Sequence, residues 1–299
     1  MRNWKHRWKP DVRNWRPDVL AFTELPVKTF ALIDLARAIS GGRGMVTLAS
    51  IVPKAVGSID RLEELSAILR STAEKRRLLA FSRVFASDDP FATMYTLINA
   101  YGFGPFVPDT ILVGVPMKEP KLKSISALAS SVAKLRRSAI FVRESQNGFE
   151  SDKNASLIDR IDVWWRGKNQ NGSFMLALAS LVVQSSERKT RIRLCQIAEK
   201  GVEPAEAEKN LSDFLSSSRV DADVYVKACD LDKSPISAIA EVSADARYTF
   251  IGLRSPREQE TPESYADYFR QMRESTSALP SAIFALAAEG VDFKQIYRE

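Results

Sequence analysis

The sequence predicts an α/β fold in two similar halves, each a mainly parallel five-stranded sheet flanked by helices. Three observations predict it. Short apolar runs rich in β-branched residues alternate with longer segments of helical periodicity, as in βα units on a parallel sheet. The alternation pauses at one polar stretch, residues 145–156 (SQNGFESDKNAS), whose composition is typical of a linker. It then restarts and supplies as many strands after this stretch as before it.

Five strands and four helices are expected before the polar stretch. The apolar runs predict strands over residues 18–23, 45–52, 79–85, 110–115 and 138–142. Helical spacing predicts helices near residues 27–39, 59–77, 90–101 and 120–135. The second helix shows the spacing well, with an apolar face formed by Ile59, Leu62, Leu65, Ile68 and Leu69. Asp88 and Asp89 stand before Pro90 and predict a capped helix start, not a magnesium site.

The second half repeats the pattern. Its strands are predicted over residues 159–165, 191–197, 223–228, 247–253 and 281–285, and its helices near 172–185, 203–218, 234–242 and 261–277. The chain therefore divides into a leader (1–16), a first subdomain (17–144), a linker (145–157) and a second subdomain (158–299). Equal strand numbers suggest a duplication, although no fixed-period repeat supports it. This hypothesis predicts two separate sheets, and one continuous sheet would contradict it.

Composition and charge are those of a folded protein that does not bind nucleic acid. Of the 299 residues 45% are hydrophobic and 27% charged. No apolar run reaches the ~18–20 residues that a membrane-spanning helix needs, and no signal peptide is present, so we expect a cytosolic chain. Residues 1–17 hold six basic groups and one acidic group and so carry most of the formal net charge of +6. The nearly neutral remainder produces no broad field for phosphate backbones.

The residues do not support an enzyme. The only histidine, His6, lies in the leader, so a hydrolase triad is excluded. His6 and two widely spaced cysteines, Cys195 and Cys229, cannot form a zinc cluster, and we expect no cofactor. Each cysteine lies in or at the end of an apolar run. Buried thiols in a reducing compartment are therefore expected rather than a disulfide.

Nucleotide binding is the alternative function, because open α/β sheets bind ligands at the carboxyl ends of their strands. A phosphate loop must run from strand through glycine turn to helix. Gly41–Gly44 and Gly102–Gly104 occur in the opposite order, after a helix and before a strand, and are interpreted as left-handed helix stops. Only residues 166–172 (RGKNQNG) have the required order, without a Walker or dinucleotide pattern. A flexible surface loop is the competing interpretation there.

Three basic clusters fall at helix ends just before strands. They are Lys75-Arg76-Arg77, Lys134 with Arg136 and Arg137, and Arg188-Lys189. Cations at these positions complement the negative end of the helix dipole, so no ligand is needed to explain them.

The leader differs from the rest of the chain because tryptophans alternate with its basic residues. Such a mixture suits a membrane–water interface. The membrane-facing candidates are Trp4, Arg7, Trp8, Trp15 and Arg16. The alternative, that the tryptophans pack on the domain and the charges are solvated, stays open.

Several segments resemble the carboxy-terminal cytoplasmic domain of the cation–chloride cotransporters, the Na–K–Cl and K–Cl cotransporter family. Asn14-Trp15-Arg16-Pro17 is similar to the opening N-[WF]-R-P of that domain, which leads into an apolar strand. Gly102 and Gly104, then Pro108-Asp109-Thr110, are similar to its G-L-G…P-N-T stretch. Ile161-Asp162-Val163-Trp164-Trp165, followed by Gly172, is similar to its I-D-V-W-W segment, the most specific of the three. Trp164 and Trp165 are predicted to point to opposite faces of the sheet, with both in the core as one alternative.

The resemblance implies a regulatory domain, either Rossmann-like or similar to universal stress proteins, that forms a homodimer and has no catalytic activity. It implies as partners the transmembrane transport domain of the same full-length chain and the inner membrane surface. The domain would lie on the cytoplasmic face of the cell membrane, tethered through that transmembrane part, in a symporter moving chloride with sodium or potassium. The chain lacks the long phosphosite-rich insertions of animal members and is more similar to a microbial relative. The alternative is a stand-alone nucleotide-binding protein like the universal stress proteins.

Overall fold

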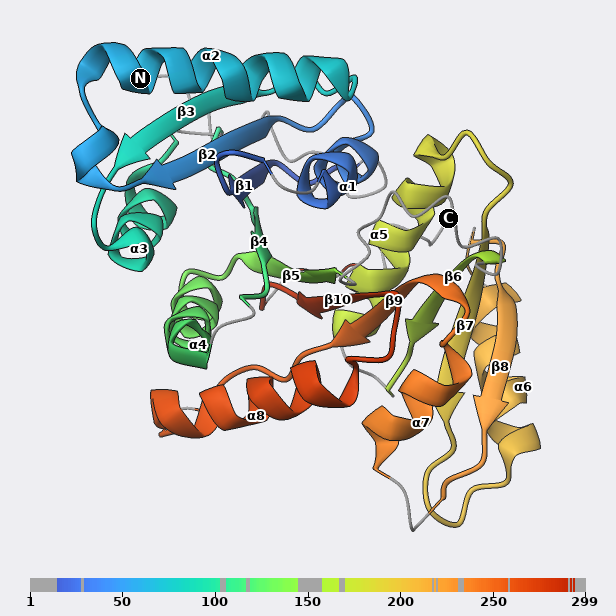
Figure 1. Ribbon diagram of the computed structural model, residues 1–299. Helices are drawn as coiled ribbons and strands as arrows, with labels where there is room; N and C mark the ends of the chain where they lie inside the picture. Colours follow the sequence, from blue (N-terminus) through green and yellow to red (C-terminus); the bar gives the residue numbers. More distant parts are fainter. Residues whose placement is uncertain are drawn as a thin grey trace, which may run out of the picture.

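The α/β fold is confirmed by the computed structural model of the chain (Figure 1). The structure describes residues 15–27, 30–102, 106–116, 119–144, 158–166, 170–216, 218, 220–230, 234–257, 259–289, 291 and 293. Within these ranges all the predicted strands and helices are present, and most ends agree within two residues. In the described part of the chain, no helix combines the length and the apolar character needed to cross a bilayer.

The first half alternates strands and helices from the start of the described chain. Its elements are β1 (Val19–Thr23), α1 (Ala31–Ser40), β2 (Val46–Val52), η3 (Lys54–Val56), α2 (Ile59–Lys75), β3 (Phe81–Ala86), α3 (Pro90–Ala100), β4 (Thr110–Gly114), α4 (Glu119–Lys134) and β5 (Ser138–Glu144). Local sequence sets their ends: Asp89 caps α3 by accepting from the amides of Phe91 and Ala92, and Gly41 ends α1 in the left-handed region.

The second half has the same alternation. Its elements are β6 (Ile158–Trp164), α5 (Gln170–Ser185), β7 (Arg191–Ile197), α6 (Pro204–Ser216), β8 (Asp223–Lys227), α7 (Pro235–Val242), β9 (Ala246–Gly252), α8 (Pro262–Ser275) and β10 (Ser281–Leu286). Helices α7 and α8 each begin with a serine or threonine cap followed by proline, the capping pattern that the sequence carries at both sites.

All ten strands form one sheet in the order β3-β2-β1-β4-β5-β10-β9-β6-β7-β8. Counted from its outer edge, each half follows the same strand order, and neighbours within a half are parallel. The expectation of two separate sheets is wrong, because β5 and β10 pair antiparallel at the centre. An inner edge strand leaves backbone donors and acceptors unpaired, and each half satisfies those of the other.

The central pairing places the halves around a local twofold axis. Phe141 of β5 lies opposite Phe284 of β10, and both side chains are buried on the same face. Strand registers on either side match: Val113 pairs with Phe141 as Ile251 pairs with Phe284. Equivalent positions of the two halves can therefore be compared residue by residue.

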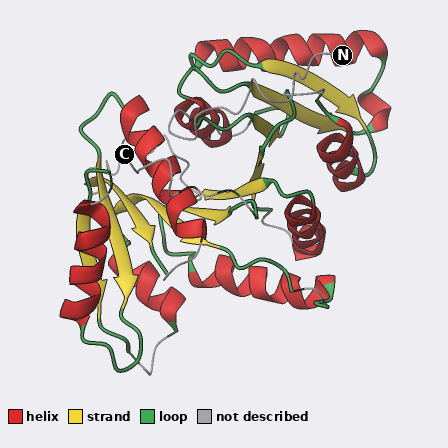
Figure 2. Cartoon of the chain, turned by 180° about the vertical axis from the view of Figure 1, so that it is seen from behind, coloured by secondary structure: helices red, strands yellow, loops and turns green. Residues whose placement is uncertain are grey.

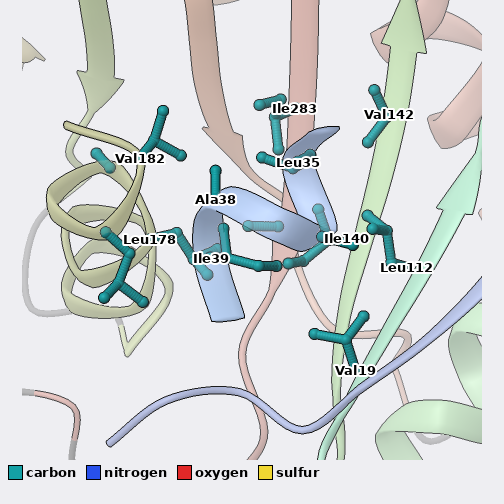
Figure 3. Packing of buried hydrophobic residues seen from close by; sticks show 14 of the residues in the cluster. Val19, Leu35, Ala38, Ile39, Leu112, Ile140, Val142, Leu178, Val182 and Ile283 are labelled. Atoms are coloured by element: carbon teal, nitrogen blue, oxygen red, sulfur yellow. The ribbon is translucent and has the colours of Figure 1, made fainter. Parts of the chain in front are cut away.

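Helices cover both faces of the sheet (Figures 1 and 2). Helices α1, α2, α5 and α6 pack on one face, and α3, α4, α7 and α8 on the other. At the centre α1 contacts α5, and α4 contacts α8, so the helices of one half pack directly on those of the other. Figure 3 shows this packing: Ile39 of α1 lies beside Leu178 of α5, and Leu35 of α1 lies beside the strand residue Ile283. One core cluster on each face thus spans both halves.

Two predictions about burial are wrong. Only Leu69 of the predicted apolar face of α2 is fully buried, and Ile59 and Ile68 are exposed. Helix α2 lies over the edge strand β3, beyond which no strand extends the sheet to cover the rest of that face. Cys195 is buried in β7 as expected, but Cys229 is exposed, because it follows β8 at the opposite outer edge.

Candidate functional site

Two of the family-like motifs meet at the amino-terminal ends of β1 and β4. The Trp15 indole donates to Asp109 Oδ2 at 3.3 Å, and the Asp18 amide donates to Asp109 Oδ1 at 3.1 Å. Thr110 Oγ1 also donates to Asp109 Oδ1, at 2.7 Å. The carboxylate therefore joins the chain entering the first strand to the start of the fourth. Pro17 and Pro108 flank this contact and are both buried.

Burial raises the pKa of Asp109 to about 6. Desolvation is the main cause, and the neighbouring Asp18 charge adds to it, while the hydrogen bonds from Thr110 and Trp15 oppose the shift. Asp109 stands where the similar family stretch has asparagine. A neutral amide at this position would accept hydrogen bonds without the cost of a buried charge.

Trp15 packs on the domain between its two halves. Its ring meets the edges of Phe174 on α5 and Phe293 after β10, with centroids 6.0 and 5.2 Å apart. Arg16 donates to the Trp15 carbonyl at 2.8 Å and contacts Gln184 Oε1 at 3.4 Å. The Trp15 indole is therefore engaged by protein groups, and the membrane-facing interpretation of Trp15 and Arg16 stays a prediction. The other leader candidates Trp4, Arg7 and Trp8, and the motif residue Asn14, lie outside the described residues.

The third motif builds a buried ionic cluster in the second half. Asp162 of β6 is fully buried and accepts from Arg160 at 2.8 Å and from Arg193 of β7 at 2.6 Å. Ser243 Oγ donates to it at 2.7 Å and accepts from the Trp164 indole at 3.0 Å. Three side chains thus donate to the buried carboxylate, and the cluster ties β6, β7 and the end of α7 together.

Trp164 and Trp165 point to opposite faces, as the alternation along a strand predicts. Both are buried: Trp164 belongs to the core cluster on the α7–α8 face and Trp165 to the cluster on the α5–α6 face. The Trp165 ring packs on Phe214 of α6 at 4.8 Å. A Cβ at Gly172 would lie 2.6 Å from this ring. Gly172 is therefore required by the tryptophan and not by a phosphate.

Asn171 joins α5 to the segments that follow β9 and β10. Its side-chain amide donates to the Leu253 carbonyl, and its carbonyl accepts from the Ala287 amide at 2.7 Å. Asn171 is the buried second residue of α5. It occupies the position outside the carboxyl ends of the strands where doubly wound sheets bind ligands. Residues 167–169 of the predicted RGKNQNG loop lie outside the described chain.

The remaining motif glycine, Gly102, follows α3 with φ +102°, and a Cβ there would lie 2.5 Å from the Phe106 carbonyl. The interpretation as a turn residue fits this geometry. Gly104 lies outside the described residues.

The outer edge of the first half carries large exposed apolar side chains, and among the described residues the β8 edge has none. Leu79 and Phe81 at the start of β3 are 92% and 65% exposed, and Ile68 of the overlying α2 is 50% exposed. A groove of about 540 Å³ follows this edge, lined among others by Thr47, Arg70, Phe81, Phe85, Leu97 and Tyr101.

The strand registers make the contrast between the two edges explicit. One row of side chains crosses the first half as Ala139, Ile111, Leu20, Thr47 and Phe81. The equivalent row of the second half reads Ala282, Thr249, Asp162, Arg193 and Asp223. The row ends on an exposed phenylalanine at one edge and on an exposed aspartate at the other. Charge on an edge strand opposes pairing with another chain. At this position β3 has Phe81 where β8 has Asp223, although Arg83 of β3 is also exposed.

The comparisons with known proteins agree on the fold. No family model matches the sequence. Its structure is similar to the crystal structure of the cytoplasmic domain of a prokaryotic cation chloride cotransporter, with a TM-score of 0.63 and 17% identity over 94% of this chain and 99% of that one. The fold is shared with this domain.

The same fold occurs in universal stress proteins. One from Archaeoglobus fulgidus matches with a TM-score of 0.58 and 11% identity over 91% of this chain and 97% of that one. A putative one from Pseudomonas aeruginosa matches with a TM-score of 0.57 and 9% identity over 95% and 98%. At these identities the similarity establishes architecture and leaves function to the residues.

Sequence reasoning missed Asn171 and the exposed edge. Phe81 lies in an apolar run (LLAFSRVF) that is typical of a buried strand. Helix α2, which lies over β3, is poorly buried, and this indicates that β3 is at the edge of the sheet. The many charged residues of α2 were a signal in the sequence for this edge position.

Proposed function

We propose that this chain is the cytoplasmic regulatory and dimerisation domain of a cation–chloride cotransporter, tethered to the membrane through the transmembrane part of a longer protein. The observation that carries the proposal is the meeting of Trp15 with Asp109, which connects two separately recognised family-like motifs in one contact. The similarity in fold to the cytoplasmic domain of a prokaryotic cation chloride cotransporter supports the same assignment.

The contact at Trp15 also suggests how a membrane domain would be coupled to this one. The chain preceding β1 reaches the domain at Trp15, which contacts Asp109 in the first half and Phe174 in the second. A displacement of the preceding segment would therefore act on both halves at once. Such coupling requires contacts that differ between two states of the transporter.

The proposed dimer surface is the β3 edge, and its occupant is a second copy of this chain. Residues 59–66 of α2 carry a net charge of −2, and residues 70–77 carry +3. Two copies joined through antiparallel β3 strands would place their α2 helices antiparallel, with the acidic end of each opposite the basic end of the other. Ile68 lies near the middle of α2, where the twofold axis would pass. The β5–β10 pairing already joins two halves in this way, with flanking helices in contact.

The test is the state of the protein that carries this sequence in its own cells. Membranes and cytosol are separated and probed with an antibody against the domain. We expect a membrane-bound band far above 33.4 kDa, and chloride-dependent cation uptake that is lost when the domain is deleted. A cytosolic band near 33.4 kDa would contradict the proposal.

The alternative, a nucleotide-binding protein similar to the universal stress proteins, is tested directly by calorimetry. Because the Asn171 side chain is bonded to the backbone that follows β9 and β10, at the carboxyl ends of these strands, we expect no saturable heat on titration with ATP at micromolar concentration. Asn171→Gly removes this side chain, and its titration with ATP is compared with that of the unaltered chain. Saturable binding of ATP by the unaltered chain would favour the alternative.

A further inference from the structure

Two basic clusters from different halves of the sequence come together at one cleft. The cleft has a volume of about 610 Å³ and is formed by α1, the end of α2, the end of α5 and the start of β9. Six cationic side chains line it: Arg37, Lys75, Arg76, Arg77, Arg188 and Arg247. Only two lining residues are acidic, Asp34 and Glu187. The helix dipole explains each cluster separately, but it does not explain why both face one cavity.

The floor of the cleft is apolar and its walls are charged. Leu35, Ala38 and Val182 line it and are buried core residues of α1 and α5, and Figure 3 shows Ala38 between the other two. A charge held against an apolar floor is less screened by water than one on an open surface, so its interaction with an ion is stronger. The volume is in the range of small-molecule sites, about 300–1,000 Å³.

The cations of the cleft are incompletely neutralised. Arg76 is paired with Asp34, its Nε at 2.9 Å from Oδ1, and Arg247 with Asp159 at 2.9 Å. These two guanidinium groups are thereby held in place.

Three further cations are available to a ligand to different degrees. Arg37 and Lys75 have no carboxylate oxygen within 4.0 Å in the described part of the chain. Arg188 lies 3.9 Å from Asp159 and is not counted among the available cations. Arg77 pairs with Glu187 across the cleft at 2.8 Å, but both side chains are more than 80% exposed. Exposed pairs contribute little and exchange readily, so a stronger anion would displace Glu187.

We propose that this cleft binds an anion carrying two or more phosphoryl groups, and thereby links the two halves of the domain. Guanidinium groups match phosphate oxygens in bidentate geometry, and several fixed cations around one cavity favour a multiply charged ligand over chloride or a single carboxylate. The phosphoryl groups could belong to a free polyphosphate or to a phosphorylated lipid headgroup. The cleft shares Lys75, Arg76 and Arg77 with the basic end of α2, but its assignment does not depend on the proposed transporter role.

Calorimetric titration with sodium tripolyphosphate at 0.15 M salt tests the site. We expect one saturable site with micromolar affinity. Arg37→Gln with Lys75→Gln should weaken binding at least tenfold. The matched control, Lys200→Gln with Lys209→Gln, removes the same charge from exposed positions outside the cleft and should change affinity less than twofold. Melting curves verify that both variants are folded.

A variant with the opposite expected sign strengthens the test. Glu187→Gln removes the acid that competes for Arg77 and should tighten binding about two- to fivefold. Absence of saturable binding by the unaltered chain, or an equal loss in the cleft and control variants, would overturn the proposal.

Vesicle flotation distinguishes the two sources of the phosphoryl groups. Vesicles containing phosphatidylinositol bisphosphate are compared with phosphatidylserine vesicles of the same charge. Flotation with the first alone, lost in Arg37→Gln with Lys75→Gln, assigns a lipid headgroup. Tripolyphosphate binding without flotation assigns a free anion. Failure of both assays refutes the site and leaves the transporter assignment untouched.

Discussion

Asp162 places a carboxylate at the centre of the second half's sheet, at a position where the first half has Leu20. Removing a charge from water is costly, and the structure offsets that cost with two arginines and a serine hydroxyl. The motif tryptophan Trp164 completes the arrangement by donating to the same serine. The aspartate and tryptophan of the motif are therefore linked through Ser243, which lies far from them in sequence.

Asp162→Ala should lower the free energy of unfolding by about 3–5 kcal/mol, because it leaves Arg160 and Arg193 without their buried partner. Asp245→Ala is the matched control. It removes the other carboxylate that pairs with Arg160, and the Asp245 side chain is 46% exposed. This substitution should lower the free energy of unfolding by less than about 1 kcal/mol. Urea denaturation measures both. Equal effects of the two substitutions would show that Asp162 is not the centre of the cluster.

Asp109 makes stability depend on pH in a defined direction. Its folded pKa of about 6 lies above the ordinary value of 3.8, so the folded state holds the proton more tightly. The resulting stabilisation is complete below pH 3.8 and is lost as pH rises through 6. The difference between the two pKa values corresponds to at most about 3 kcal/mol in the free energy of unfolding.

Asp109→Asn should therefore raise the free energy of unfolding at pH 7 by about 1–2 kcal/mol and flatten its decrease between pH 4 and 6. The gain is below the maximum, because the amide accepts fewer of the three hydrogen bonds. Asp213→Asn on an exposed position of α6 controls for the loss of one charge. A pH profile that is unchanged by Asp109→Asn would assign the dependence to another group.

At the scale of elements, the two outer strands β3 and β8 occupy equivalent places but have opposite surface chemistry. Phe81 and Asp223 end equivalent rows of the sheet. Sheet edges are protected by charge, and an unprotected edge is a template for another strand. This difference is the reason that the proposed dimer surface is on β3 and not on β8.

Phe81→Asp gives β3 the aspartate that β8 has at the equivalent position. It should convert the proposed dimer, of twice 33.4 kDa, into a monomer. The dissociation constant of the dimer should rise at least a hundredfold. Sedimentation equilibrium measures the change. Asp223→Asn on the opposite edge should leave the mass unaltered. A monomeric unaltered chain, or a dimer that persists in Phe81→Asp, would exclude this edge as the interface.

At the scale of the whole molecule, the two halves share a sheet and a core. The cluster on the α1–α5 face includes Ile39 from the first half and Phe174 from the second, and Asn171 of α5 also binds the backbone that follows β10. Neither half completes its core alone. Domains that share a core in this way unfold as one cooperative unit.

Scanning calorimetry should show a single unfolding transition whose calorimetric and van't Hoff enthalpies agree. Two resolved transitions would mean that the β5–β10 pairing joins two independently stable units. Leu35→Ala and Phe174→Ala, one in each half, should shift the same transition downward, since both side chains lie in the shared cluster.

Local patterns in the sequence determined the alternating elements and their ends. The spacing of apolar residues fixed the ten strands and eight helices, and the caps at Asp89 and the glycine at Gly41 fixed helix ends, because these signals act within a few residues. The order of glycine and strand likewise excluded a phosphate loop at Gly41. The opposite faces of Trp164 and Trp165 followed from alternation along one strand.

Only the tertiary structure decided which groups are neighbours. The merging of two sheets through β5 and β10, the exposure of Phe81 at an edge, the partners of Asp162 and the convergence of two basic clusters on one cleft all involve residues distant in the sequence. Local periodicity specifies which face of an element is apolar, but not what covers it. That depends on strand order and on the ends of the sheet, and these are set by packing of the whole chain.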